Sequence, residues 1–193
     1  MLETLLKFDR ALFLAINHWR NPFLDAVMPV VTNRWVWIPL YVLLALLLWR
    51  RFRKQTILIA GTIVLLIVAS DQTANLFKNH LCCRLRPCYN PELMNQVIAP
   101  AGCGGQYGFV SGHAANSAAL ALFLWLLAGA LPGFAVRGKR RWWLILFLWV
   151  FVVCWSRIYM GVHYPFDVIG GALTGFLWAI ILYWIYKKFA PRI

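Results

Sequence analysis

Five long apolar stretches, separated by short basic segments, constrain the fold of this chain more than any other feature of its sequence. They cover roughly residues 33–50, 55–78, 112–133, 141–156 and 164–186. Each is close to the ~20 residues that a helix needs to cross a bilayer. A soluble domain of 193 residues has no core large enough for a chain that is 62% hydrophobic, so lipid must solvate part of it. The sequence therefore predicts an all-α, polytopic membrane helical bundle of about five spans, forming one domain over 1–193.

The first 33 residues are too polar for a span. Their leucines and phenylalanines suit an amphipathic helix that lies in the membrane interface. Glu3 stands where a cleavable signal peptide would carry basic residues, so we expect the spans themselves to direct membrane insertion.

Basic residues are concentrated in alternate connecting segments and in the tail. They are Arg50, Arg51, Arg53 and Lys54, then Arg137, Lys139, Arg140 and Arg141, then Lys187, Lys188 and Arg192. The positive-inside rule makes their side of the membrane cytoplasmic. The 79–111 loop, the short turn before the last span and the N-terminal segment then face outward. A net charge of +13 would also suit nucleic acid, but these cations fall between apolar runs, so we expect no nucleic-acid binding.

The outward loop of residues 79–111 holds four of the five cysteines. They are Cys82, Cys83, Cys88 and Cys103. An oxidising compartment would let some of them pair, and a bridge between Cys88 and Cys103 would tie a loop rich in Pro, Gly and Asn. The alternative is that all four are free thiols.

A polar island at residues 156–167 separates the last two apolar stretches. Pro165 suits the first position of a helix, which places His163 just before that helix and Asp167 in its first turn. Asp167 would then hydrogen-bond one imidazole nitrogen and leave the other free as a nucleophile or base. The alternative is a helix start whose carboxylate complements the dipole, with Arg157 snorkelling to the headgroups.

A second island, Ser111-Gly112-His113, opens the third span. Ser111 suits an N-cap, and Gly112 lets the backbone approach a ligand closely. Free N–H groups at a helix start favour phosphate, to which His113 could donate a proton. The alternative is a capped helix with an interfacial histidine.

A third island closes the second span. Asp71, Asn75 and Lys78 share one helix face, where Asp71 is expected to orient Lys78 or another cation. Lys78 and Arg86 together would clamp a phosphate. The alternative is that these cations snorkel at the end of a span. All three islands fall on one side of the membrane, and together they meet the needs of phosphoryl transfer through a phosphohistidine.

With these motifs the sequence resembles the type 2 phosphatidic acid phosphatases. That family's signature has three parts: Lys, six residues, Arg-Pro; then Pro-Ser-Gly-His; then Ser-Arg, five residues, His, three residues, Asp. The third part is matched in full by Ser156-Arg157, His163 and Asp167. The second appears with Val110 in place of Pro. In the first, seven residues instead of six separate Lys78 from Arg86-Pro87.

The resemblance implies a membrane phosphatase that uses no metal and no cofactor. His163 resembles the family nucleophile, Asp167 its orienting carboxylate and His113 the general acid. The phosphate-binding shell would be Lys78, Arg86, Ser111, Gly112 and Arg157. The composition agrees about metals, because six acidic residues in the whole chain leave no carboxylate cluster to hold Mg²⁺.

The expected substrate is a lipid phosphate or pyrophosphate in the outer leaflet of a bacterial cytoplasmic (inner) membrane. The candidates are undecaprenyl pyrophosphate, phosphatidylglycerol phosphate and the 1- or 4′-phosphate of lipid A. The competing hypothesis is a non-catalytic membrane protein that binds or transports a lipid phosphate. The intact set of His113, His163 and Asp167 favours the enzyme, because binding alone would not need it. Nothing in the sequence sets an oligomeric state.

Overall fold

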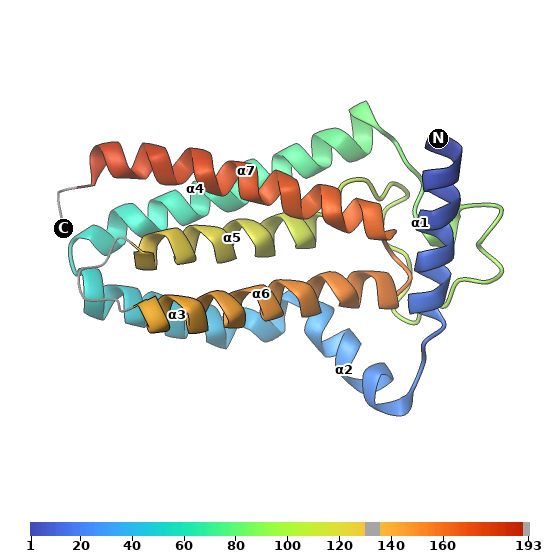
Figure 1. The fold of residues 1–193 in the computed structure, drawn as a ribbon, viewed down its shortest axis with the longest axis horizontal. Coiled ribbons are helices and arrows are strands. Elements are labelled where there is room, and N and C mark those ends of the chain that lie inside the picture. Colours follow the sequence, from blue (N-terminus) through green and yellow to red (C-terminus); the bar gives the residue numbers. More distant parts are fainter. Residues whose placement is uncertain (130–135, 191–193) are drawn as a thin grey trace.

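The computed structural model describes residues 1–129 and 136–190, and all of its regular elements are helices (Figure 1). The α-helices are α1 (Leu2–Asn17), α2 (Pro22–Thr32), α3 (Ile38–Phe52), α4 (Gln55–Leu76), α5 (Gly112–Gly129), α6 (Val136–Tyr159) and α7 (Pro165–Phe189). A 3₁₀ turn at Arg34–Trp37 precedes α3, a π-helical turn at Phe77–Leu81 extends α4, and a 3₁₀ turn lies at Pro87–Tyr89. The predicted all-α class is confirmed.

Helices α3 to α7 run side by side along the length of the molecule (Figure 1). Among the described residues, four helical segments are long and apolar enough to cross a membrane: Arg34–Phe52, Gln55–Leu81, Gly112–Gly129 and Pro165–Phe189. The fourth predicted span corresponds to α6, whose apolar part, Trp143–Tyr159, is shorter. Residues 130–133, the end of the third predicted span, lie outside the described residues. Positions 137–141 were expected in a loop but form the first turns of α6, since Lys and Arg are good helix formers.

The N-terminal segment differs from the single interfacial helix that the sequence predicts. It forms two helices, because Asn21 accepts a hydrogen bond from the Leu24 amide at 2.9 Å and Pro22 starts a new helix there. Helix α1 lies across one end of the bundle (Figure 1). Its residues Asp9, Phe13, Ile16 and Asn17 are buried, and their spacing places them on one face. That face packs on the bundle, so α1 is part of the fold as well as an amphipathic helix.

Helix α7 packs against α5 with almost no space between the two backbones. A Cβ added at Gly175 would lie 2.1 Å from the carbonyl oxygen of Ala115, and one at Gly171 would lie 2.4 Å from that of Ser111. Small residues four apart allow such contact between membrane helices. The packing also brings the two helix starts together, because the Ser111 amide donates to the carbonyl oxygen of Asp167 at 2.8 Å.

The three polar islands meet at one end of the bundle. The end of α4, the loop that follows it, the start of α5 and the turn between α6 and α7 all lie at the end covered by α1 (Figure 1). The basic segment between α3 and α4 and the C-terminal end of α7 lie at the opposite end. The alternation of charged segments along the sequence thus corresponds to a real separation between the two ends of the molecule.

Candidate active site

A cavity of about 630 Å³ opens among the three islands and is continuous with an apolar channel between the helices. Most of the predicted site residues line its polar part. They are Lys78, Arg86, Gly112, His113, Arg157 and His163. Ser111 and Asp167 are fully buried behind this surface. The volume is that of an ordinary small-molecule site, and here cations and imidazoles converge at its polar end.

Lys78 lines the cavity even though the sequence places it one residue out of step with the family signature. It lies in the π-helical turn Phe77–Leu81, where the Cys82 amide donates to the carbonyl oxygen of Phe77 at 2.9 Å. An i→i+5 turn accommodates one more residue than an α-helical turn. The turn therefore takes up the extra residue between Lys78 and Arg86 and leaves both cations at the same cavity.

The role expected of Asp71 in orienting Lys78 stays a prediction, although its carboxylate acts electrostatically on that cation. Within the described residues Asp71 accepts a hydrogen bond from the Asn75 amide group at 3.3 Å, and no salt bridge joins it to Lys78. Both side chains nevertheless lie near the start of α5. A Cβ built on Gly112 would be 3.4 Å from the Asp71 Oδ1 and 3.5 Å from the Lys78 Nζ.

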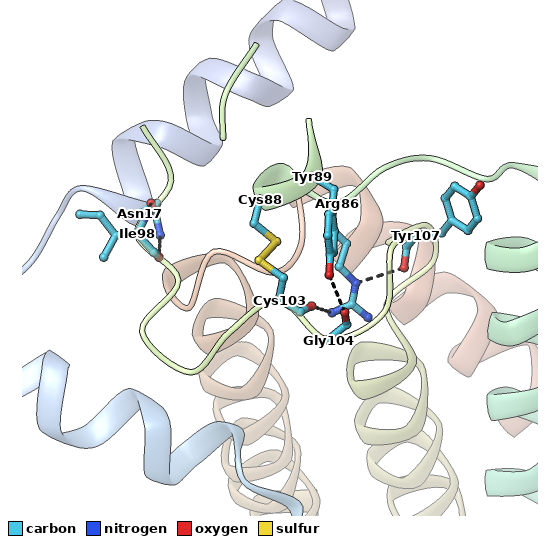
Figure 2. Close-up of a disulfide and its surroundings, with 8 residues drawn as sticks. All are labelled: Asn17, Arg86, Cys88, Tyr89, Ile98, Cys103, Gly104 and Tyr107. Atoms are coloured by element: carbon cyan, nitrogen blue, oxygen red, sulfur yellow. Dashed lines mark hydrogen bonds between the residues drawn. A yellow bond between two sulfur atoms is a disulfide. The ribbon is translucent and has the colours of Figure 1, made fainter. Parts of the chain in front are cut away.

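Arg86 is held by backbone carbonyls of the outward loop (Figure 2). Its Nη1 donates to the carbonyl oxygen of Cys103 at 2.6 Å, and its Nε donates to that of Tyr107 at 3.1 Å. Its own amide donates to the carbonyl oxygen of Gln106 at 3.0 Å. Two edges of the guanidinium are thereby fixed. The side chain can present its remaining N–H groups to the cavity in one orientation.

A disulfide joins Cys88 to Cys103 and ties together the two segments that hold Arg86 (Figure 2). The pairing that the sequence left open as one possibility is therefore present, while Cys82 and Cys83 are free and exposed. Tyr89 adds a second link, because its hydroxyl donates to the carbonyl oxygen of Gly104 at 3.2 Å. The bridge thus fixes the loop around a cation of the site.

The start of α5 has the geometry predicted for an anion-binding helix end. The Ser111 Oγ accepts a long hydrogen bond from the Ala114 amide, at 3.5 Å, so Ser111 caps the helix. Gly112 and His113 face the cavity directly. Ser111 does not line the cavity. Its contribution to phosphate binding stays a prediction, and it would act by capping the helix whose start binds the anion.

Arg157 comes from the last turn of α6 and reaches the same cavity. Its Nη1 donates to the hydroxyl of Thr32, at the end of α2. Its Nε is buried and has no hydrogen-bond partner in the described part of the chain. Buried donors are nearly always paired in native proteins, and exceptions are often at functional sites. A snorkelling role does not fit a guanidinium turned into the bundle.

The side chains of His163 and Asp167 lie next to each other, but the predicted hydrogen bond between them is not formed. The His163 Nδ1 lies 3.6 Å from the Asp167 Oδ2, beyond hydrogen-bond distance, and both side chains are almost fully buried. The reason is competition for the carboxylate. Its Oδ2 accepts from the Tyr164 amide at 3.0 Å, as a capping residue of α7, and its Oδ1 accepts from Arg84 at 2.9 Å.

Sequence reasoning assigned no role to three residues that hold this pair. Arg84 bridges Asp167 and Asp9, at 2.9 and 2.6 Å. Gly108 packs so closely that a Cβ there would lie 2.9 Å from the Asp167 Oδ2. The sequence offered only a weak signal for Arg84, as a second arginine two positions before Arg86. Asp9 carried a weaker signal, as an acid among the otherwise apolar positions Phe13 and Ile16 of its helix face.

The electrostatics of the cavity suit a neutral nucleophile. Burial lowers the pKa of His163 well below its ordinary value, and the charges of Arg157, Arg86 and Lys78 lower it further. His163 is therefore neutral at neutral pH, with a free lone pair on its imidazole. Burial also lowers the pKa of Arg86, against the opposing effect of Asp167, but a guanidinium stays charged at any physiological pH.

Within residues 1–129 and 136–190, no group of three or more His, Cys, Asp or Glu side chains is arranged to hold a metal ion. The predicted site residues that the structure brings together supply cations, imidazoles and the buried carboxylate of Asp167. This set can bind a phosphoryl group, attack it and protonate a leaving oxygen.

Comparisons with known proteins agree with this geometry. The sequence pattern of the PAP2 superfamily matches residues 57–191. The lipid A 4'-phosphatase of Bacteroides thetaiotaomicron is 36% identical over all of this chain and 83% of that protein. The lipid A 4'-phosphatase of Porphyromonas gingivalis is 32% identical over 96% of this chain and 75% of that protein. The crystal structure of a transmembrane PAP2 type phosphatidylglycerolphosphate phosphatase from Bacillus subtilis matches with a TM-score of 0.75. It is 23% identical, covering 97% of this chain and 88% of that one, and shows the shared fold.

The fold and the site thus define a multi-pass membrane enzyme of the phosphatase class. The chain belongs to the PAP2 superfamily. The predicted family is confirmed, and the family pattern covers the part of the chain from α4 to α7 that carries the three motifs.

The disulfide generates a first prediction. In the double variant Cys88→Ser/Cys103→Ser, the carbonyl of Cys103 is no longer fixed against Arg86, so we expect KM for a phosphorylated lipid to rise about tenfold. That is the loss of roughly one charge-assisted hydrogen bond. The matched control is Cys82→Ser/Cys83→Ser, which removes two thiols from the same loop and should leave KM unchanged. Equal KM values in the two variants would contradict the assigned role of the bridge.

A second prediction concerns pH. In Arg157→Gln, kcat/KM should fall by about 100-fold, as it does when a donor to a developing anion is removed. Losing the cation also raises the pKa of His163, so the histidine becomes protonated at a higher pH. The acidic limb of kcat/KM should therefore move up by about one pH unit. The control is Arg50→Gln, a cation at the far end of the bundle. Both variants are measured on one substrate, so ionisation of the substrate affects their pH profiles equally. Identical acidic limbs of kcat/KM in the two variants would refute the role assigned to Arg157.

Proposed function

We propose that this protein hydrolyses a phosphate monoester of a membrane lipid, and that the 4′-phosphate of lipid A is its substrate. One observation carries the proposal: a single cavity joins His113, His163 and the cations Lys78, Arg86 and Arg157 to an apolar channel. Two relatives that align along nearly the whole chain, at 36% and 32% identity, carry the name lipid A 4'-phosphatase.

The channel has the dimensions of a lipid tail. Its walls come from α3, α4, α5 and α6, and along α4 the lining reaches from Lys78 back to Thr56. At 1.5 Å per helical residue that is about 30 Å, the thickness of the hydrocarbon core of a bilayer. A soluble phosphate ester would use only the polar end of such a cavity. A lipid places its headgroup among the cations and its chains along the apolar wall.

The proposed reaction proceeds in two displacements. The neutral His163 attacks phosphorus, an N–P bond forms, the P–O bond to the lipid breaks and His113 protonates the departing oxygen. His113 then takes a proton from water, whose oxygen attacks phosphorus and releases His163 and inorganic phosphate. Lys78, Arg86 and Arg157 stabilise the charge on the equatorial oxygens, together with the amides at the start of α5.

We further propose that the site faces the exterior or periplasmic side of a bacterial cytoplasmic membrane. The support is the positive-inside rule, since the basic segments lie at the end of the bundle opposite the site. The disulfide in the site loop fits the same side, because disulfides persist in oxidising compartments.

Phosphate release from purified protein in proteoliposomes tests the activity. We expect turnover of lipid A 4′-phosphate in excess EDTA and a loss of more than about 1000-fold in kcat with His163→Ala, as for removal of a covalent nucleophile. The matched control is His80→Ala, an exposed histidine at the same end of the bundle. Undecaprenyl pyrophosphate, phosphatidylglycerol phosphate and the 1-phosphate of lipid A complete the panel. Turnover of one of these instead would reassign the substrate, and wild-type rates from His163→Ala would refute the mechanism.

Orientation has its own test. In intact spheroplasts, a membrane-impermeant maleimide should label the exposed Cys82 and Cys83. In a Cys82→Ser/Cys83→Ser background, an added Lys188→Cys at the other end should react only after permeabilisation. The reverse pattern would place the site in the cytoplasm.

A further inference from the structure

Helix α1 contributes a fully buried carboxylate to the end of the bundle that holds the site. Asp9 is 0% exposed and lies on the buried face that also carries Phe13, Ile16 and Asn17. A buried charge is costly unless it is paired and hydrogen-bonded. Asp9 must therefore have partners whose arrangement depends on it. It also lies outside residues 57–191, the part of the chain that the superfamily pattern covers.

The partners of Asp9 lead directly to the histidine pair. Its Oδ2 accepts from the Arg84 Nη2 at 2.6 Å, and its Oδ1 accepts from the Phe166 amide at 2.9 Å. The other terminal nitrogen of Arg84 donates to the Asp167 Oδ1 at 2.9 Å. One guanidinium thus bridges a carboxylate of α1 and the carboxylate beside His163, and Asp9 also caps the helix that carries Asp167.

Arg84 contacts residues of the site but does not line the cavity. It is not among the cavity-lining residues, whereas Arg86, two positions along the same extended segment, is. Its guanidinium also lies 4.0 Å above the ring of Tyr164, the residue that follows His163. Helix α1 also contacts this ring directly, because Phe13 packs edge-on against Tyr164 with 5.4 Å between the ring centroids. Asp9 and Arg84 therefore hold the segment 163–167 without reaching the phosphate.

The charges give this arrangement a chemical consequence. A guanidinium paired with Asp167 alone would neutralise it, but Arg84 is shared by two carboxylates, which leaves the group with a net negative charge. That charge lies next to His163, which becomes positive when its imidazole attacks phosphorus. Stabilisation of developing charge by a fixed, preorganised partner lowers the barrier without affecting substrate binding.

We propose that Asp9 is a positioning residue for the reaction: through Arg84 it sets the place and the charge of Asp167, and thereby the reactivity of His163. The inference rests on the proposed phosphatase function. It assigns a role to α1, an element that the sequence indicated only as an interfacial helix.

Asp9→Asn tests the proposal, because the amide oxygen can still cap Phe166 while the charge and the contact with Arg84 are lost. We expect kcat to fall about 10- to 100-fold, the range seen when a carboxylate behind a functional histidine is removed. KM, and competitive inhibition by inorganic phosphate, should stay within twofold of wild type. The matched control is Asp25→Asn in α2, which loses its contacts with Arg20 and the Tyr159 hydroxyl, at 2.6 and 2.7 Å.

A double-mutant cycle separates this role from a general loss of structure. Lysine cannot bridge two carboxylates as a guanidinium does, so Arg84→Lys should lower kcat by a similar factor. The double variant Asp9→Asn/Arg84→Lys should be no slower than Arg84→Lys alone, because both changes break one connection. If Asp9→Asn does not fold, the test rests on Arg84→Lys. A lower kcat with unchanged inhibition by inorganic phosphate supports the proposal, and a wild-type kcat overturns it.

Three results would overturn the inference. They are a wild-type kcat in Asp9→Asn, a loss no larger than that of Asp25→Asn, or losses that multiply in the double variant. An active wild type with an equally active Asp9→Asn overturns this inference alone. A wild type inactive on the whole lipid panel overturns the proposed function and this inference with it.

Discussion

The burial of one carboxylate, Asp167, is the constraint on which the rest of the site depends. It is fully shielded from water, so its charge must be paired and hydrogen-bonded, and the donors come from distant parts of the chain. Arg84 arrives from the outward loop, the Tyr164 amide from the start of α7, and Asp9 of α1 holds Arg84 in turn. The loop, α1 and α7 therefore fold around this group together.

Lipid as the surrounding solvent explains why such a polar centre occurs in so apolar a chain. Helices α3 to α7 satisfy their own backbone groups, and glycines let α5 and α7 approach closely. The three polar islands lie at the end of the bundle that α1 covers, away from the basic segments at the other end. At the end that α1 covers, cations that could individually snorkel to the headgroups converge on one cavity instead.

Much of the site followed from the sequence because its parts are local. His163 and Asp167 are four residues apart around a helix start, and Ser111-Gly112-His113 is a helix start by itself. The residues that were missed act over long sequence separations: Asp9 and Arg84 are 75 positions apart, and Arg84 and Asp167 are 83. Periodicity and motif spacing contain no information about such pairs. The π-helical turn at Lys78 was equally hidden, because a one-residue excess in a spacing does not say where the chain absorbs it.

The sequence by itself determined the class of fold, the end of the bundle at which the three polar islands lie, and the residue types of the candidate site. Hydropathy and charge suffice for these, since both act on each segment independently of the others. Only the tertiary structure decided which carbonyls orient Arg86, that Arg84 and the Tyr164 amide occupy the carboxylate expected to bind His163, and that α1 belongs to the site. These features depend on how buried charges share a limited number of partners, and that competition is resolved only when all the segments are packed together.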